Sequence, residues 1–239
     1  MGKKIYRNKG SKDNIVISIA GPHGIGKTTI FNLLKNKLEE MPKFKFFPER
    51  YIKKPPFPFG SPDKQVGFRS EIHFLQQFIK RNQRIINFDN KYNGRIMILD
   101  RTPICVLIYS KSLNLKEKDY NLILDMYKSV KWREDYVIYL SANPDIILKR
   151  IVQRGSLENF RKDWNEYEKE YLLRIISFYN QLLLTKYENN RIFIIDTTNL
   201  SLHEVLEKVE NVITQVSGYS FKKSHIAPTT QMSLKKFIK

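Results

Sequence analysis

The sequence contains a single cysteine, Cys105, among its 239 residues. One cysteine cannot form an internal disulfide, and the sequence shows no cysteine and histidine spacing of the kind that binds structural zinc. It also lacks the run of ~18 apolar residues that a membrane-spanning helix requires. The basic N-terminus is not followed by the apolar segment of a secretory signal. These absences argue against a disulfide scaffold or a membrane protein, and we expect a cytoplasmic location.

Acidic residues are missing from both ends of the chain. Residues 1–12 and residues 218–239 each carry five Lys or Arg and no Asp or Glu. Subtracting these ten from the 42 basic residues leaves 32 against 24 acidic ones, so most of the net charge of +18 lies in the two ends. We expect a basic arm over residues 1–13, a folded domain over 14–217 and a flexible basic tail over 218–239. The remaining positive charge suits an anionic ligand such as a nucleotide or nucleic acid.

Short apolar runs alternate with longer amphipathic segments between the two arms. The runs rich in β-branched and aromatic residues predict strands at 14–20, 43–47, 95–100, 135–140 and 191–196. Helical spacing of apolar residues predicts helices at 28–41, 65–88, 118–130, 144–155, 164–187 and 201–216. Strand and helix alternation of this kind predicts an α/β fold. We expect a three-layer arrangement, a five-stranded parallel sheet with helices on both faces.

The segment GPHGIGKT at 21–28 fits the phosphate-binding pattern G-x-x-x-x-G-K-[ST], and it lies between a predicted strand and a predicted helix. Its glycines allow backbone N–H groups to turn toward phosphate oxygens. The helix N-terminus adds a partial positive charge. Lys27 is placed to reach the β- and γ-phosphates, and the Thr28 hydroxyl to hold Mg²⁺. The residues expected to bind the nucleotide are Gly21, Pro22, His23, Gly24, Ile25, Gly26, Lys27, Thr28 and Thr29.

Charged residues follow the next two predicted strands. Glu49 follows the second strand, and Asp100 with Arg101 ends the third, so all three are expected beside the phosphate loop at the carboxyl edge of the sheet. A carboxylate at Glu49 would take the proton of an attacking hydroxyl, anchor a sugar or hold Mg²⁺. Asp100 is a candidate Mg²⁺ ligand through water, and Arg101 a candidate clamp for the transferred group.

Two further arginines, Arg150 and Arg154, lie four residues apart on one face of the helix predicted at 144–155. A charged turn follows them. We expect them to act catalytically from a mobile flap over the γ-phosphate that also excludes water.

These segments resemble the thymidylate kinase and deoxynucleoside kinase superfamily of P-loop kinases. The matching pieces are GPHGIGKTT, PER, LDRTP, LKRIVQRG and IIDTT, which span about residues 14–216 in the family's order. The resemblance implies ATP and Mg²⁺ as cofactors and a small nucleoside or nucleoside monophosphate as acceptor. It also implies a homodimer. The family's acceptor-binding helix corresponds to residues 71–84, so either Gln76 or Gln77 would contact the base, and Arg81 or Arg84 the base or phosphate.

Two departures from the family pattern leave the acceptor open. Thymidylate kinases usually carry an acidic residue in the phosphate loop near His23. Nucleoside kinases usually carry a carboxylate six residues after the acid of the third strand, where this chain has Val106. Two alternatives therefore stand beside a nucleotide kinase. One is a clamp-tethered, ATP-binding replication or repair factor without small-molecule turnover, and the other is a kinase of polynucleotide 5′-ends.

The chain ends in TQMSLKKFIK, which fits Q-x-x-[LIM]-x-x-F followed by an apolar residue. The pattern resembles the peptide with which replication proteins dock onto the sliding clamp. One short helical turn would place two apolar side chains in an apolar groove while the glutamine makes hydrogen bonds. The residues expected to bind the partner are Gln231, Leu234, Phe237 and Ile238.

Overall fold

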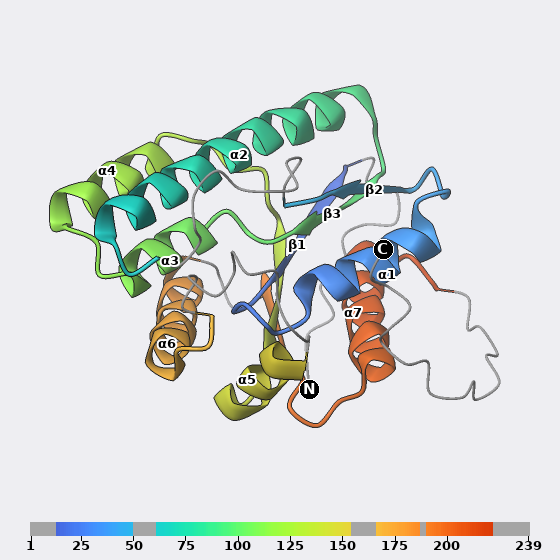
Figure 1. Ribbon diagram of the computed structural model, residues 1–239. Coiled ribbons are helices and arrows are strands. Elements are labelled where there is room, and N and C mark those ends of the chain that lie inside the picture. The colour runs from blue at the N-terminus through green and yellow to red at the C-terminus, as the bar shows by residue number, and fades with distance from the viewer. Residues whose placement is uncertain (1–12, 50–60, 154–165, 187–189, 222–239) are drawn as a thin grey trace.

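A computed structural model describes residues 13–49, 61–153, 166–186 and 190–221. Within these ranges, all strands run parallel in one five-stranded sheet of order β2-β3-β1-β4-β5 (Figure 1). The strands are β1 (Ile15–Ala20), β2 (Phe44–Phe47), β3 (Ile96–Asp100), β4 (Tyr136–Ser141) and β5 (Ile192–Asp196). Because β1 is the central strand, the loop that follows it is flanked by the carboxyl ends of β3 and β4. The predicted fold class is confirmed.

Helices cover both faces of the sheet (Figure 1). They are α1 (Lys27–Leu38), α2 (Lys64–Lys91), α3 (Cys105–Ser112), α4 (Glu117–Lys128), α5 (Pro144–Gln153), α6 (Lys169–Lys186) and α7 (Leu202–Ser217). Helices α1 and α7 pack on one face, and α2, α3, α4 and α6 on the other. Within the described residues, no helix has both the length and the apolarity needed to cross a membrane.

Alternate residues of the strands enter opposite halves of the core. Ile17 of β1 packs on the side of α1 and α7, whereas the adjacent residue Val16 packs with Met97 and Leu99 on the α2 side. This alternation follows from the two-residue repeat of a strand. A strand buried on both faces must be apolar throughout, which is why the sequence shows these strands as short continuous apolar runs.

Several helix ends differ from the sequence-based bounds by a few residues, and local chemistry explains them. Asp63 caps α2 by accepting hydrogen bonds from the backbone N–H groups of Gln65 and Val66, so the helix starts at Lys64. Helix α7 begins at Leu202 because Ser201 forms a capping box with Glu204. Helix α6 begins at Lys169 rather than near residue 164, because residues 166–167 form a turn.

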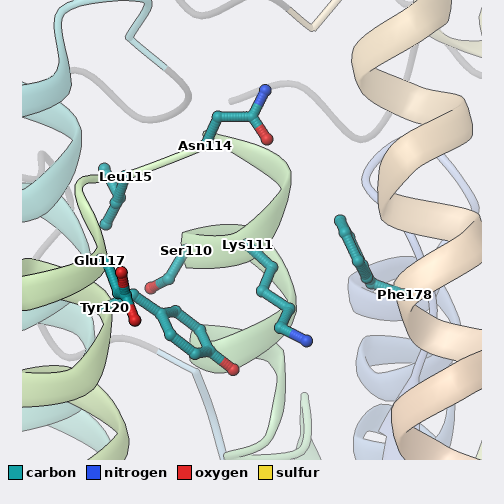
Figure 2. A pocket seen from close by; sticks show the side chains of 7 residues that line it. All are labelled: Ser110, Lys111, Asn114, Leu115, Glu117, Tyr120 and Phe178. Atoms are coloured by element: carbon teal, nitrogen blue, oxygen red, sulfur yellow. The ribbon is translucent and has the colours of Figure 1, made fainter.

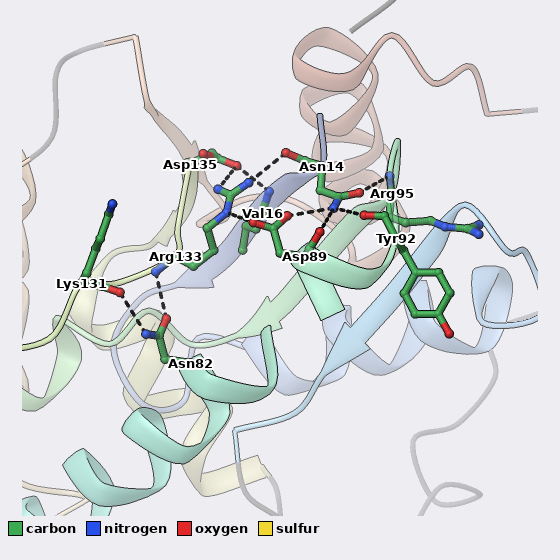
Figure 3. A network of polar contacts seen from close by, with 9 residues as sticks. All are labelled: Asn14, Val16, Asn82, Asp89, Tyr92, Arg95, Lys131, Arg133 and Asp135. Atoms are coloured by element: carbon green, nitrogen blue, oxygen red, sulfur yellow. Dashed lines mark hydrogen bonds and ion pairs between the residues drawn. The ribbon is translucent and has the colours of Figure 1, made fainter. Parts of the chain in front are cut away.

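A polar network ties the amino-terminal end of the sheet together (Figure 3). Arg133 pairs with Asp89 of α2 and with Asp135 before β4, each at 2.7 Å. Its guanidinium also donates to the carbonyl of Asn14 at 3.0 Å. The Asn14 amide in turn donates to the Asp89 carboxylate at 2.8 Å. This network joins β1, α2 and β4 at the edge opposite the phosphate loop, so its role is structural.

The chain after α7 returns to the edge strand β2. The ring of Tyr219 meets the ring of Phe44 edge-on at 4.8 Å, and Phe221 lies 5.0 Å from Tyr219. Lys37 of α1 lies over the Phe221 ring at 5.5 Å. The packed chain therefore extends to Phe221, past the boundary expected at residue 217. The predicted tail peptide with Gln231, Leu234, Phe237 and Ile238 lies outside the described residues.

Candidate active site

The phosphate loop joins β1 to α1, as its sequence pattern predicts. Two of its glycines are required by close packing as well as by backbone conformation. At Gly21 (φ 144°) a Cβ would lie 2.5 Å from the carbonyl oxygen of Leu140, and at Gly24 (φ 79°) 2.5 Å from the Ile151 side chain. The loop thus rests on β4 and α5, with its peptide groups at the N-terminus of α1. This is the arrangement that binds a phosphate chain through backbone N–H groups.

Lys27 is the first residue of α1, and its side chain is buried. Its ammonium group donates a hydrogen bond to the carbonyl of Pro22 at 2.7 Å, across the phosphate loop. Burial, followed by the positive charge of Arg101, lowers the pKa of Lys27 to about 7. An anionic phosphate placed in the loop would reverse this effect, because it supplies the negative charge that the buried ammonium lacks.

The next residue, Thr28, faces the end of β3. Its hydroxyl donates to Oδ2 of Asp100 at 3.0 Å. The other oxygen of that carboxylate, Oδ1, is buried and has no hydrogen-bond partner among the described residues. Burial and the neighbouring Glu49 raise the pKa of Asp100. A hydroxyl beside a carboxylate with a vacant oxygen matches the hard oxygen ligands that Mg²⁺ prefers, so these two residues fit a magnesium site.

Glu49 and Arg101 form an ion pair at this edge of the sheet. Arg101 Nε lies 2.9 Å from Glu49 Oε1, and both side chains are largely buried. Arg101 has a left-handed backbone (φ 68°), which is uncommon for a residue other than glycine. Such a conformation persists only where the surrounding structure holds it, and it is frequent at functional sites.

Arg81 of α2 stabilises the left-handed backbone at Arg101 through two hydrogen bonds. Its guanidinium donates to the carbonyl of Asp100 at 2.5 Å and to the carbonyl of Arg101 at 2.7 Å. The side chain is 1% exposed and lies 4.6 Å from the centre of the Phe78 ring. Arg81, one of the two arginines expected to contact the acceptor, is therefore buried and bonded to the main chain. Its donors are engaged by main-chain carbonyls on both sides of the strained residue.

The other residues proposed for acceptor binding lie on the outer side of α2. Gln76 and Arg84 are exposed and Gln77 is half-buried. The buried stripe of α2 instead carries Glu71, which is 1% exposed. Glu71 precedes Phe74 and Phe78 by three and seven residues, so it occupies a position of the apolar stripe. A charged residue in such a position is the signal that sequence inspection missed.

His23 connects the phosphate loop to α3 and α6. Its ring stacks on Tyr171 at 5.9 Å and lies 6.4 Å from Tyr109. Its Nε2 lies 3.2 Å from the carbonyl oxygen of Glu166. His23 is thus buried between aromatic side chains. Together with Arg101, which lies 5.6 Å from the Tyr109 ring, it forms one side of a polar interior between β3, α3 and α6.

Arg150 of α5 contacts the loop after β5. Its guanidinium donates to the hydroxyl of Thr197 at 2.9 Å and to the carbonyl of Thr197 at 2.6 Å. Thr197 follows β5, which is two strands from β1, or ~10 Å at the usual strand spacing. The catalytic role expected for Arg150 stays a prediction, and in this structure its donors contact the loop after β5. Arg154 lies outside the described residues.

A separate groove of about 370 Å³ lies between α3, α4 and α6 (Figure 2). Lys111 reaches into it, with its ammonium group 5.7 Å from the Tyr120 ring and 5.5 Å from the Phe178 ring. The lining contains no residue of the phosphate loop and neither member of the ion pair. The groove is therefore not the place where phosphate chemistry is expected.

Comparison with known proteins identifies relatives over most of the chain. The model of the deoxynucleoside kinase family matches residues 17–220. A deoxyadenosine/deoxycytidine kinase of Bacillus subtilis is 24% identical over 214 residues, which cover 84% of this chain and 94% of the relative. A probable thymidylate kinase of Archaeoglobus fulgidus is 27% identical over 157 residues, which cover 62% of this chain and 74% of the relative.

Solved structures match the fold as well. The deoxyadenosine kinase of M. mycoides with bound dATP superimposes with a TM-score of 0.66 at 25% identity. The match covers 84% of this chain and all of the other one. The same enzyme with dCMP and dCDP gives a TM-score of 0.67 at 24% identity.

Proposed function

The chain belongs to the deoxynucleoside kinase family, and we propose that it transfers the γ-phosphoryl group of ATP to the 5′-hydroxyl of a deoxynucleoside. The observation that carries the proposal is the Glu49–Arg101 ion pair of 2.9 Å, which acts electrostatically on Lys27 of the phosphate loop. A general base, a cation and a phosphate-binding lysine are the parts that phosphoryl transfer needs at one place.

On the donor side, the phosphate loop and Lys27 would bind the β- and γ-phosphates. Thr28 and Asp100 would hold Mg²⁺, which supplies charge neutralisation at the transferred group when it is bound. Arg150 offers a planar guanidinium fixed on Thr197. We assign it to the donor base rather than to the γ-phosphate, because a guanidinium plane stacks on rings.

On the acceptor side, Glu49 would accept the proton of the 5′-hydroxyl as its oxygen forms a bond to the γ-phosphorus. The bond from that phosphorus to the β,γ-bridging oxygen breaks, and ADP leaves. Arg101 holds the Glu49 carboxylate in place and faces the charge that develops on the transferred group. Arg81 is a positioning residue, since it fixes the backbone on both sides of this pair.

A nucleoside fits the described side chains better than a nucleoside monophosphate. The buried cations Arg101 and Arg81 already have partners in the protein. The buried carboxylate of Glu49 would face the phosphate of a monophosphate acceptor. Adding a dianion beside a carboxylate is unfavourable in a buried site. Several relatives, including the A. fulgidus protein, are named as kinases of nucleoside monophosphates. A nucleoside monophosphate is therefore the second candidate acceptor.

An acceptor panel tests the proposal. The protein is incubated with ATP, Mg²⁺ and each of the four deoxynucleosides or their 5′-monophosphates, and ADP release is followed. We expect at least one deoxynucleoside to have a kcat/KM ten or more times that of its monophosphate. The reverse order would assign the protein to nucleoside monophosphate phosphorylation. If only 5′-hydroxyl oligonucleotides stimulate ADP release, the protein would instead be a kinase of polynucleotide 5′-ends.

Binding of ATP is expected to take up a proton at alkaline pH. The pKa of Lys27 lies at about 7 in the free protein, so at pH 8 most molecules carry a neutral amine. The bound triphosphate favours the ammonium form, so ~0.9 proton enters on binding at pH 8 and almost none at pH 6. Apparent ATP affinity should fall with rising pH and reach about a tenfold decrease per pH unit above pH 8. Titration calorimetry in buffers of different ionisation enthalpy measures this uptake.

Two lysine variants of α1 test whether Lys27 is the group that takes up the proton when ATP binds. Lys27→Met should abolish the proton uptake, whereas Lys35→Met, at an exposed position, should leave it unchanged. Uptake that persists in Lys27→Met would assign the proton to another group.

We further propose that the C-terminal peptide binds a sliding clamp and tethers the kinase to it. The support is the sequence pattern Gln231, Leu234 and Phe237, together with the anchoring of the chain at Tyr219 and Phe221. A clamp-bound factor without turnover is not favoured, because the chain belongs to a kinase family.

Deletion of residues 229–239 is expected to abolish binding to the clamp of the same organism and to leave ADP release unchanged. Surface plasmon resonance with immobilised clamp measures the first effect, and the Phe237→Ala variant should reproduce it. If the full-length protein does not bind the clamp, the tethering proposal is wrong while the kinase assignment stands.

A further inference from the structure

Glu71 is a buried carboxyl group that the phosphoryl-transfer steps do not use. It lies on the inner face of α2 and is 1% exposed. Its Oε1 has no hydrogen-bond partner among the described residues. A buried carboxyl without a partner is costly, and proteins retain such groups mainly where a ligand or a reaction needs them.

Other polar groups without partners surround the same interior. Within the described part of the chain, they include the hydroxyls of Tyr171 and Tyr179 on α6. Both residues are buried, with exposed fractions of 2% or less. The Tyr171 ring stacks on His23 of the phosphate loop, so this interior adjoins the donor site. The two tyrosine hydroxyls of α6 and the Glu71 carboxyl of α2 would line the acceptor site.

Resting on the proposed nucleoside kinase function, we propose that Glu71 determines acceptor specificity by binding the acceptor as a neutral carboxylic acid. In that form the group donates one hydrogen bond through its O–H and accepts another through its C=O. It therefore recognises a part of the acceptor that both donates and accepts. Two parts of a deoxynucleoside have this chemistry, the 3′-hydroxyl of the sugar and the hydrogen-bonding edge of the base.

The protonation state follows from the surroundings of Glu71. The charged or titratable groups that face it come from the ends of β2 and β3 and from α3 and α6: Glu49, Arg101, Cys105, Tyr109 and Tyr171. Burial raises the pKa of Glu71 to about 8, against the opposing effect of Arg101. The carboxyl is consequently neutral at pH 7 and loses its donor as the pH rises above 8.

Two substitutions of Glu71 distinguish a role in acceptor binding from a role in the stability of the fold. Glu71→Gln keeps a donor and an acceptor but does not titrate, and Glu71→Met keeps the size but neither hydrogen bond. At saturating ATP and pH 7, we expect Glu71→Met to raise the acceptor KM about 10- to 100-fold, as the loss of buried hydrogen bonds predicts. Glu71→Gln should stay within about threefold of the wild type. The wild-type acceptor KM should rise above pH 8, and that of Glu71→Gln should not.

Thermal unfolding of the same variants provides a readout that does not depend on turnover. The ordinary pKa of Glu lies near 4.5, so folding at pH 7 must place a proton on Glu71. Removing the carboxyl should therefore leave Tm unchanged or raise it. The matched control is Glu134→Met, which should lower Tm because Glu134 bonds to the hydroxyls of Ser18 and Thr102.

Substrate analogues identify the part of the acceptor that is recognised. If Glu71 binds the sugar, Glu71→Met should lose the preference for a 2′-deoxynucleoside over its 2′,3′-dideoxy analogue. If it binds the base, the variant should instead lose discrimination among the four bases. Either loss supports the inference. An unchanged acceptor KM and unchanged preferences, or a lowered Tm in Glu71→Met, would overturn it. A wild-type protein that turns over no nucleoside would overturn the proposed function and this inference together.

Discussion

Replacing Glu49 by glutamine is expected to lower kcat about 10²- to 10⁴-fold, because the variant cannot accept the proton of the attacking hydroxyl. The amide oxygen can still accept a hydrogen bond from Arg101, whose Nε lies 2.9 Å from the carboxylate in the native protein. The geometry of the pair should therefore survive. ATP binding uses the phosphate loop and Lys27, so the ATP dissociation constant should stay within about threefold. Steady-state kinetics and calorimetry measure the two quantities.

The matched control is Glu40→Gln, at an exposed position after α1, which should leave kcat unchanged. An unfolding curve for Glu49→Gln checks that the fold is intact. If Glu49→Gln keeps its full turnover, Glu49 is not the base and the mechanism must be reassigned. If it loses ATP affinity and turnover together, the residue serves the donor rather than the acceptor.

The second large effect is expected for Arg81→Met, which acts at a distance from the substrates. The substitution would leave the carbonyls of Asp100 and Arg101 buried without their present donors. An unsatisfied buried acceptor costs about 1–3 kcal/mol, so we expect the free energy of unfolding to fall by about 2–4 kcal/mol. The left-handed backbone of Arg101 would also lose its support. Because Arg101 holds Glu49, kcat should fall at least about tenfold with little change in the ATP dissociation constant.

Arg81→Lys distinguishes positioning from a contact with the acceptor. A lysine supplies a donor for one of the two carbonyls, so it should recover part of the lost stability and part of kcat together. Chemical denaturation and steady-state kinetics of both variants test this. A variant of unchanged stability with an acceptor KM raised on its own would instead show that Arg81 binds the acceptor directly.

Local patterns were sufficient to predict the fold and the place of the phosphate loop in it. The strand expected at 95–100 is Ile96–Asp100, because an apolar β-branched run bounded by polar residues specifies a buried strand without reference to the rest of the chain. The phosphate loop could be located for a similar reason, since its chemistry lies in consecutive residues. Glu49 and Arg101 were expected at one edge of the sheet, and the ion pair joins them there.

The acceptor side depends on contacts between distant segments, which a single sequence does not contain. Arg81 and Gln76 lie on one helix, and only packing against β3 and α3 decides that Arg81 is buried and Gln76 exposed. The buried face of α2 carries apolar residues at helical spacing, and the sequence does not show that the charged residues Glu71 and Arg81 lie on that face as well. The contact between Arg150 and Thr197 could not be predicted either, because the two residues are 47 apart in the sequence.

The most direct test of the central claim is to compare each deoxynucleoside with its 5′-deoxy analogue in the presence of ATP and Mg²⁺. We predict that one or more deoxynucleosides release ADP in equal amount to a new nucleoside 5′-monophosphate, while the analogues lacking the 5′-hydroxyl give none. Equal ADP release from both members of every pair would mean that the terminal phosphate passes to water or to another acceptor, and would contradict the account.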